Sequence, residues 1–245
     1  MMNSTSLSKT EKREQRGKRN KEAIMFIGHF AVGFAAKKYA PRPSLGTYIM
    51  AINFLDLLWP IFLLLGIERV EINPGNTAFT PLAFVYYPYS HSLLAAIFWA
   101  TLFSATYYFL RKEVSGSGML WLAVFSHWIL DAVSHKPDLP LFPGSTILVG
   151  FGLWNSVSLT MIVEITIFII GIILYASETS PKNKLGTISF WSLVGFLFVS
   201  YLSNAFGPPP PSEKFLMMFS PSLWLFVFWG YWIERKRELV KKMKI

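Results

Sequence analysis

All four histidines of the chain fall in or beside apolar segments, where an ionisable side chain is costly unless it has a use. His127, Asp131 and His135 follow one another at intervals of four residues in one such segment. A step of four residues turns a helical side chain by only about 40°, so all three are expected on one face. Imidazole and carboxylate groups on one helical face are suitable ligands for a divalent metal ion.

Isolated ionisable residues in other apolar segments could complete such a site. His29 lies among small residues, Asp56 is the only acidic residue of its apolar run, and His91 follows a proline suited to a helix start. Each also has a structural interpretation, as an interfacial histidine or as a hydrogen-bond partner between helices. The sequence predicts one shared metal site with the candidate ligands His29, Asp56, His91, His127 and Asp131.

Five further residues are candidates for catalysis or substrate binding. Glu164, a lone carboxylate in a later apolar run, could complete the metal shell, act as a general base, or hydrogen-bond across helices. His135 is a second candidate proton acceptor and could instead contact substrate. Lys136 could hold a phosphate group, and Asn53 lies one helical turn before the acidic residue of its own run. Asp138 could contact substrate or support the site, or could simply be a turn residue.

The composition indicates a polytopic membrane protein. Of its 245 residues 53% are hydrophobic and only 15% are charged, whereas soluble domains usually carry about 25% charged residues. The absence of cysteine excludes disulfides and thiolate metal sites. Much of the formal net charge of +9 lies near the two ends of the chain, a pattern typical of the positive-inside rule. We therefore expect membrane lipids as partners and no nucleic acid.

Six apolar runs, each near the roughly 20 residues that cross a bilayer, predict an all-α membrane bundle. They cover approximately residues 46–67, 88–110, 117–135, 154–176, 187–206 and 215–233. Pro60 is expected to kink the first run. A shorter apolar stretch, 23–36, predicts a short helix that is re-entrant or lies at the membrane interface.

The chain is expected to form a single transmembrane domain over residues 23–233. A basic, disordered tail over 1–22 precedes it, and a basic cytoplasmic tail over 234–245 follows. Six spans place both termini on one side of the membrane, and the basic residues favour the cytoplasmic side of a plasma (inner) membrane.

Four motifs resemble, in order, those of the YdjM-like predicted membrane-bound metal-dependent hydrolases. They are Gly-His-Phe-Ala-Val-Gly at 28–33, Leu-Asp at 55–56, Tyr-Ser-His-Ser-Leu at 89–93 and Ser-His-Trp-Ile-Leu-Asp at 126–131. The resemblance covers roughly residues 28–145 and implies a helical membrane fold with the same five candidate ligands. Leu58 occupies the position of the family's second aspartate, and the loss of that carboxylate could leave one metal ion instead of two, or no catalysis.

Two classes of function follow from these patterns. The first is a membrane-embedded metal-dependent hydrolase that acts on a lipid or amphiphilic phosphoester through a metal-activated water, with Zn²⁺ as the expected ion. The second is a non-enzymatic transporter or an ion- or proton-conducting protein that uses the same intramembrane groups. Tight ligand geometry would favour the first. A continuous polar path through Asn53, Asp56, Glu164 and Asn204 would favour the second.

Overall fold

A computed structural model describes residues 27–240 of the chain. The helices are α2 (Ile27–Tyr39), α3 (Leu45–Ile52), α4 (Phe54–Leu64), α5 (Pro88–His91), α6 (Leu93–Arg111), α7 (Val114–Ser134), α8 (Val157–Glu178), α9 (Lys184–Phe206), α10 (Glu213–Phe219) and α11 (Leu223–Lys236). The short 3-10 turns are η1 (Leu153–Asn155) and η2 (Ser220–Ser222). The tail predicted over 1–22 and the end of the tail predicted over 234–245 lie outside the described residues.

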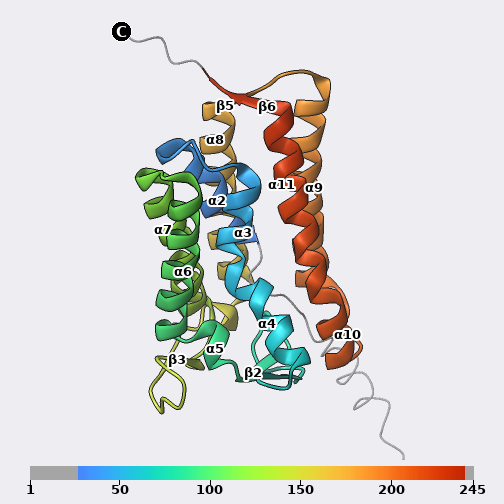
Figure 1. Ribbon diagram of the computed structural model, residues 1–245. Coiled ribbons are helices and arrows are strands. Elements are labelled where there is room, and N and C mark those ends of the chain that lie inside the picture. Colours follow the sequence, from blue (N-terminus) through green and yellow to red (C-terminus); the bar gives the residue numbers. More distant parts are fainter. Residues whose placement is uncertain (1–26, 241–245) are drawn as a thin grey trace, which may run out of the picture.

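The helices form the all-α bundle that the apolar runs predict (Figure 1). Five segments are long and apolar enough to cross a membrane: α6, α7, α8, α9, and the segment Glu213–Lys236 that joins α10 to α11. A sixth span is possible if α3 and α4, which are bent by 53° relative to each other, are counted together. These segments agree with the six predicted runs to within a few residues.

The 53° bend in the first span lies at Asn53, and α4 continues as a helix through Pro60, where the sequence predicts a kink. Helix α4 continues through Pro60, whereas Asn53 separates α3 from α4 with φ −101° and ψ 11°. The Asn53 side chain donates a hydrogen bond to the carbonyl of Ile49, 2.9 Å away. Asparagine competes with the helical backbone for hydrogen bonds in this way, and the helix breaks there.

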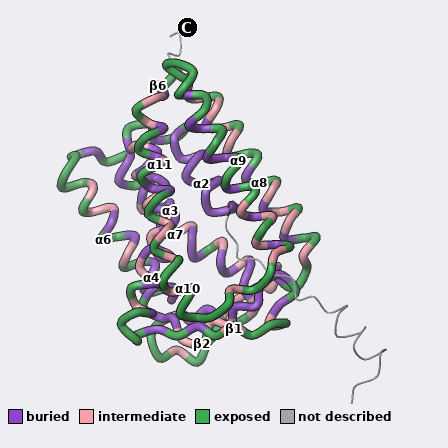
Figure 2. The backbone as a smooth tube through the Cα atoms, turned by 90° about the vertical axis from the view of Figure 1, so that its right-hand side faces the viewer, coloured by how far each residue is buried: buried purple, intermediate pink, exposed green. Residues whose placement is uncertain are grey.

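Helix α2 lies inside the bundle, packed against α8, α3 and α7 (Figure 2). Nine of its thirteen residues are buried. Its close approach to α8 depends on Gly171, where a Cβ atom would lie 2.6 Å from the carbonyl oxygen of Ala31. At 1.5 Å per residue, α2 is about 20 Å long and reaches only part of the way through a bilayer core of about 30 Å. The path of the chain before Ile27 lies outside the described residues.

Three two-stranded antiparallel sheets close the ends of the bundle. The strands are β1 (Arg69–Ile72), β2 (Leu82–Tyr86), β3 (Leu139–Pro140), β4 (Leu148–Val149), β5 (Thr179–Pro181) and β6 (Arg237–Leu239). Strand β1 pairs with β2 and β3 pairs with β4 at the end that carries α5, whereas β5 pairs with β6 at the opposite end (Figure 1).

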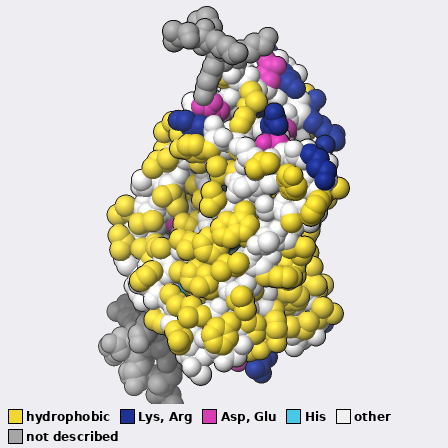
Figure 3. All heavy atoms as spheres, turned by 60° about the vertical axis from the view of Figure 1, so that its left-hand side comes forward, with side chains coloured by type: hydrophobic (Ala, Val, Ile, Leu, Met, Phe, Trp, Pro, Cys, Tyr) yellow, Lys and Arg dark blue, Asp and Glu magenta, His cyan; other side chains and the backbone are white. Residues whose placement is uncertain are grey.

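Basic residues gather at the β5–β6 end. Lys37 of α2 forms an ion pair with Glu234 of α11 at 2.6 Å, and the backbone N–H of Lys182 donates to the carbonyl of Lys236. On the face shown in Figure 3, Lys and Arg side chains lie mainly at this end, and hydrophobic side chains cover the middle. Large apolar side chains on α6, α8 and α11, such as Phe98, Ile162 and Phe228, are more than half exposed. Such a belt is typical of a lipid-facing surface.

Candidate metal centre

The five predicted ligands come from four helices and meet in the half of the bundle that carries β1–β4. His29 begins α2, Asp56 lies in the first turn of α4, and His91 ends α5. His127 and Asp131 lie in the last two turns of α7. Donor atoms of His29, His127 and Asp131 lie within 4.8 Å of one another, as do those of Asp56, His91 and His127. These buried groups could hold a metal ion.

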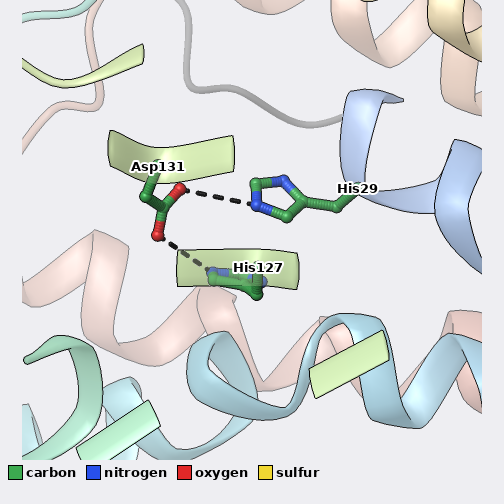
Figure 4. A group of neighbouring side chains, drawn as sticks. All are labelled: His29, His127 and Asp131. Carbon is green, nitrogen blue, oxygen red and sulfur yellow. Dashed lines mark ion pairs between the residues drawn. The ribbon is translucent and has the colours of Figure 1, made fainter. Parts of the chain in front are cut away.

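Asp131 is the centre of the group. Its Oδ1 lies 3.4 Å from His29 Nε2, and its Oδ2 lies 3.3 Å from His127 Nε2 and 3.8 Å from His91 Nε2. Figure 4 shows how the two oxygens diverge, one towards His29 of α2 and the other towards His127 one turn earlier on α7. The Asp131 side chain is only 6% exposed, so these imidazoles and not water surround the carboxylate.

Asp56 supplies the second carboxylate. Its Oδ1 lies 3.4 Å from His91 Nε2 and 3.6 Å from His127 Nε2. All of these nitrogen–oxygen distances exceed the usual 2.7–3.2 Å of a hydrogen bond. The ionisable groups thus form two sets of close donor atoms, His29–His127–Asp131 and Asp56–His91–His127, which share His127.

The other ring nitrogen of His127 is held by the backbone. Nδ1 of His127 lies 2.6 Å from the carbonyl oxygen of Ile52, the last residue of α3. A carbonyl can only accept, so Nδ1 carries a proton, and in the neutral ring Nε2 presents its lone pair to the cluster. In an unbroken helix this carbonyl would accept from Asp56 N–H, and the bend at Asn53 directs it to His127 instead.

His91 is held by a chain of two hydrogen bonds that ends at Glu68. Glu68 is buried and its carboxylate accepts from Ser90 Oγ at 2.6 Å and from the backbone N–H groups of Tyr89 and Ser90 at 2.8 Å. Since Ser90 donates to Glu68, its oxygen accepts from His91 Nδ1, 2.6 Å away. The Nε2 lone pair of His91 therefore also faces the cluster. The sequence does not predict Glu68 at the site, because its position suggests a charged residue in a loop. The one indication in the sequence is Ser90, a hydrogen-bonding residue next to His91.

His135 lies at the edge of the cluster, just past the end of α7. Its Nε2 is 4.0 Å from Asp131 Oδ1, and its Nδ1 donates to Asp138 Oδ1 at 2.9 Å. Tyr87 donates to the same Asp138 oxygen at 2.9 Å, and burial, followed by the nearby Asp138 charge, raises the pKa of Tyr87 well above its ordinary value. The phenol therefore stays a neutral donor. Asp138 orients His135, which matches the supporting role among its predicted alternatives.

Three predicted site residues interact with residues outside the cluster. Lys136 donates to Asn76 Oδ1 in the β1–β2 connection, and Asn53 uses its amide within its own helix. Glu164 is buried on α8, seven residues before the Gly171 contact with α2, which is about 10 Å along the helix. Its carboxylate is not among the converging groups, and Tyr201 of α9 lies within its electrostatic reach. Depth along a helix can be predicted from sequence, but the contacts of a side chain at that depth cannot.

The cluster is accessible on one side, at Asp56. The Asp56 side chain is 29% exposed, whereas the side chains of His29, His91, His127 and Asp131 are between 1% and 6% exposed. Asp56 is therefore the member of the cluster that lies nearest the surface of the bundle.

A scan against protein-family models, a search of curated proteins and a search of solved structures each found no match to this chain. The resemblance to the YdjM-like hydrolases rests on its four motifs and stays a prediction.

Proposed function

We propose that this protein is a membrane-embedded metal-dependent hydrolase that cleaves a phosphoester in a lipid or another amphiphilic molecule. The observation that carries the proposal is the orientation of the imidazoles. His91, His127 and His135 each engage Nδ1 with an outer acceptor and turn Nε2 towards Asp131. Such outer hydrogen bonds fix the tautomer and ring orientation of metal-ligating histidines.

The donor set fits a divalent ion, and zinc best. His91, His127, Asp56 and Asp131 would hold it, and the four nitrogen–oxygen distances of 3.3–3.8 Å are wider than the edge of about 2.9 Å expected for octahedral Mg²⁺. Imidazole also suits zinc better than magnesium. When bound, such an ion would polarise a phosphoryl oxygen and lower the pKa of a water molecule, and so supply the nucleophile.

His135 is the proton acceptor in this proposal. Its Nδ1–H donates to Asp138, so Nε2 is free to accept a proton from the attacking water and return it to the leaving oxygen. The Asp138 carboxylate would stabilise the imidazolium that forms. Tyr87, which donates to Asp138, holds that carboxylate in position.

An amphiphilic substrate suits the location of the site. The cluster lies about one turn from the end of α7, in a bundle whose outer surface is apolar. A lipid could keep its tails among the exposed apolar side chains while its phosphate reaches Asp56. The basic β5–β6 end, where α11 ends, favours a plasma (inner) membrane location with that end in the cytoplasm.

Metal analysis of the purified full-length protein tests the metal centre. Wild type should retain a divalent ion that Asp131→Ala loses, while Glu71→Gln, which changes an exposed carboxylate on β1, should retain it. Near-zero metal in all three proteins would overturn the proposal.

Hydrolysis of labelled phospholipids and simpler phosphoesters tests the reaction. The metal-loaded wild type should release product, and Asp131→Ala should not. Metal binding without cleavage of any phosphoester would overturn the hydrolase and favour the transport alternative, which ion flux into liposomes would then test.

A further inference from the structure

We propose that the β3–β4 segment, defined as the β3–β4 hairpin and the loop after it (residues 139–152), is a lipid-binding surface in the headgroup layer of the bilayer. Its occupant is the phospholipid leaflet that lies opposite the basic β5–β6 end. The proposal requires the membrane location of the bundle, and it requires neither the metal ion nor hydrolysis.

The β3–β4 segment carries no charge. Between Asp138 and Glu164 the sequence has no Asp, Glu, Lys or Arg residue. The β1–β2 hairpin at the same end of the bundle instead exposes Arg69 and Glu71. Four large apolar side chains of the β3–β4 segment are between 48% and 81% exposed, which makes an apolar patch that needs an apolar partner. They are Phe142, Ile147, Leu148 and Phe151.

The position of the segment along the bundle identifies that partner as lipid (Figure 1). The N–H of Leu94, in the first turn of α6, donates to the carbonyl of Leu141 at 3.0 Å. From Leu94 to Arg111, where α6 ends on the basic side, an upright helix rises by about 26 Å at 1.5 Å per residue. A hydrocarbon core of about 30 Å that begins at Arg111 therefore ends just beyond Leu94, where the headgroups begin.

The apolar side chains of the segment adjoin the lipid-facing belt. Leu94, Ile97 and Phe98 of α6 are exposed, and all three lie within about one turn of the hydrogen bond to Leu141. The surface that faces lipid on α6 therefore leads into the β3–β4 segment, and one leaflet can cover both.

The tip of the hairpin satisfies its polar groups locally. A turn at Gly144, where φ is 84°, lets the N–H of Ser145 donate to the carbonyl of Phe142 at 2.9 Å. The hydroxyl of Ser145 accepts from the N–H of Ile147 at 3.1 Å. Unpaired backbone groups are costly at an apolar boundary, so these bonds suit a loop that contacts lipid.

The segment is fixed to the end of α7. The N–H of Phe151 donates to the carbonyl of Ala132 at 2.8 Å, and the N–H of Gly152 donates to the carbonyl of His135 at 2.7 Å. A lipid bound by the segment is therefore held beside the helix end that carries the candidate metal centre.

The test is site-directed spin labelling of the full-length protein in phosphatidylcholine vesicles. The chain has no cysteine, so each single-cysteine variant carries one label. Phe142→Cys and Ile147→Cys sample the hairpin, Phe98→Cys samples the lipid-facing belt, and Glu71→Cys is the control on the charged hairpin. EPR power saturation then compares the access of oxygen, which concentrates in lipid, with that of a water-soluble nickel chelate.

We expect the labels at the two β3–β4 positions to prefer oxygen, as the label of Phe98→Cys does, and the label of Glu71→Cys to prefer the nickel chelate. A nickel preference at Phe142→Cys and Ile147→Cys would overturn the proposal, because the hairpin would then lie in water. Exclusion of both reagents there would also overturn it, because a second copy of the chain would then cover the hairpin.

A nickel preference at Phe98→Cys as well would overturn the membrane location on which the proposal depends. Phe151→Cys replaces either hairpin variant if that variant does not elute like the wild type in size-exclusion chromatography. None of these outcomes depends on a bound metal or on product release, so the result is independent of the proposed hydrolase function.

Discussion

Two groups of buried polar residues lie towards opposite ends of the bundle, and they satisfy their charges in different ways. At the β5–β6 end, Lys37 bonds to Glu234 at 2.6 Å and to the carbonyl of Pro43 at 2.9 Å. Arg237 donates to Thr179 Oγ1 at 3.0 Å and to the Thr179 carbonyl at 2.8 Å. Cations there meet acceptors directly, at ordinary hydrogen-bond distances.

In the metal centre the pattern is reversed. The inward atoms of His29, His91, His127 and Asp131 face one another at 3.3–3.8 Å, while outward atoms of the histidines 91, 127 and 135 make hydrogen bonds of 2.6–2.9 Å. Buried charge whose partners are all in the chain stabilises the fold. Buried imidazoles that are held in orientation by outer hydrogen bonds, and whose inner nitrogens face one another, form a binding site. The predictions below test that contrast.

The largest expected effect is the response to a chelator. Removing metal from the wild type should lower its free energy of unfolding by about 4 kcal/mol, if free metal had been about 1,000 times its Kd. Asp131→Asn, which keeps the size of the side chain and removes its charge, should unfold equally with and without chelator. Thermal unfolding in detergent measures both. A chelator effect of equal size in the variant would mean that metal stabilises some other part of the protein.

Glu68→Gln should weaken metal binding about 10- to 100-fold, although Glu68 contacts no ligand atom of the ion. The amide group would donate to Ser90 Oγ, so that Ser90 would donate to His91 Nδ1 and move the ring proton to Nε2. The inward lone pair of His91 would be lost. Competition with a metal-sensitive dye measures the affinity.

The matched control for Glu68→Gln is Glu71→Gln, which makes the same change at an exposed position of β1. It should leave affinity within about twofold of wild type, since exposed charges contribute little. Equal affinities for both variants and wild type would show that Ser90 does not set the tautomer of His91.

Lys37→Met should lower stability and leave metal binding unchanged. The substitution removes the ion pair with Glu234 and the bond to Pro43, and we expect a loss of about 2 kcal/mol, below the usual range for a buried pair. We expect a smaller loss than for a fully buried pair because the Glu234 side chain is 32% exposed and still accepts a hydrogen bond from the Leu45 N–H. Chemical denaturation measures the loss of stability, and metal analysis measures whether the variant keeps its metal. Loss of metal from Lys37→Met would contradict the proposed difference between the two ends of the bundle.

Tyr87→Phe should have the smallest effect, about 1 kcal/mol, because Asp138 keeps its bond to His135. The folded-state pKa of Tyr87 is raised, so the stability that its neutral phenol contributes is fully present below the unfolded pKa of about 10 and is lost only at higher pH. The difference in unfolding free energy between variant and wild type should therefore be constant from about pH 6 to pH 9. A change within that interval would contradict the assignment of Tyr87 as a neutral donor.

The sequence was sufficient to predict the spans and most of the inner site. Hydrophobic runs determine where helices cross, and the lone His and Asp residues in those runs identified His29, Asp56, His91, His127 and Asp131. The sequence was not sufficient to predict the residues that hold these candidate ligands in orientation. Glu68 is distant in the chain from the histidine that it supports, and only the fold brings it to Ser90.

Backbone details were equally beyond prediction. Pro60 is the stronger helix breaker by propensity, but the bend follows the side-chain bond of Asn53. Glu164 and Asp56 are both lone carboxylates within apolar runs, and only the packing of the helices separates the one near Tyr201 from the one beside His91.

The bond between His127 and the Ile52 carbonyl has a consequence for how the site can change over time. Every amino acid has a carbonyl, so no substitution at position 52 can delete this acceptor, whereas Glu68 and Asp138 can be lost in one step. The orientation of His127 is therefore robust to point mutation at its partner. That orientation still depends on the shape of the α3–α4 bend, so a substitution at Asn53 would disturb His127 without changing either His127 or its acceptor.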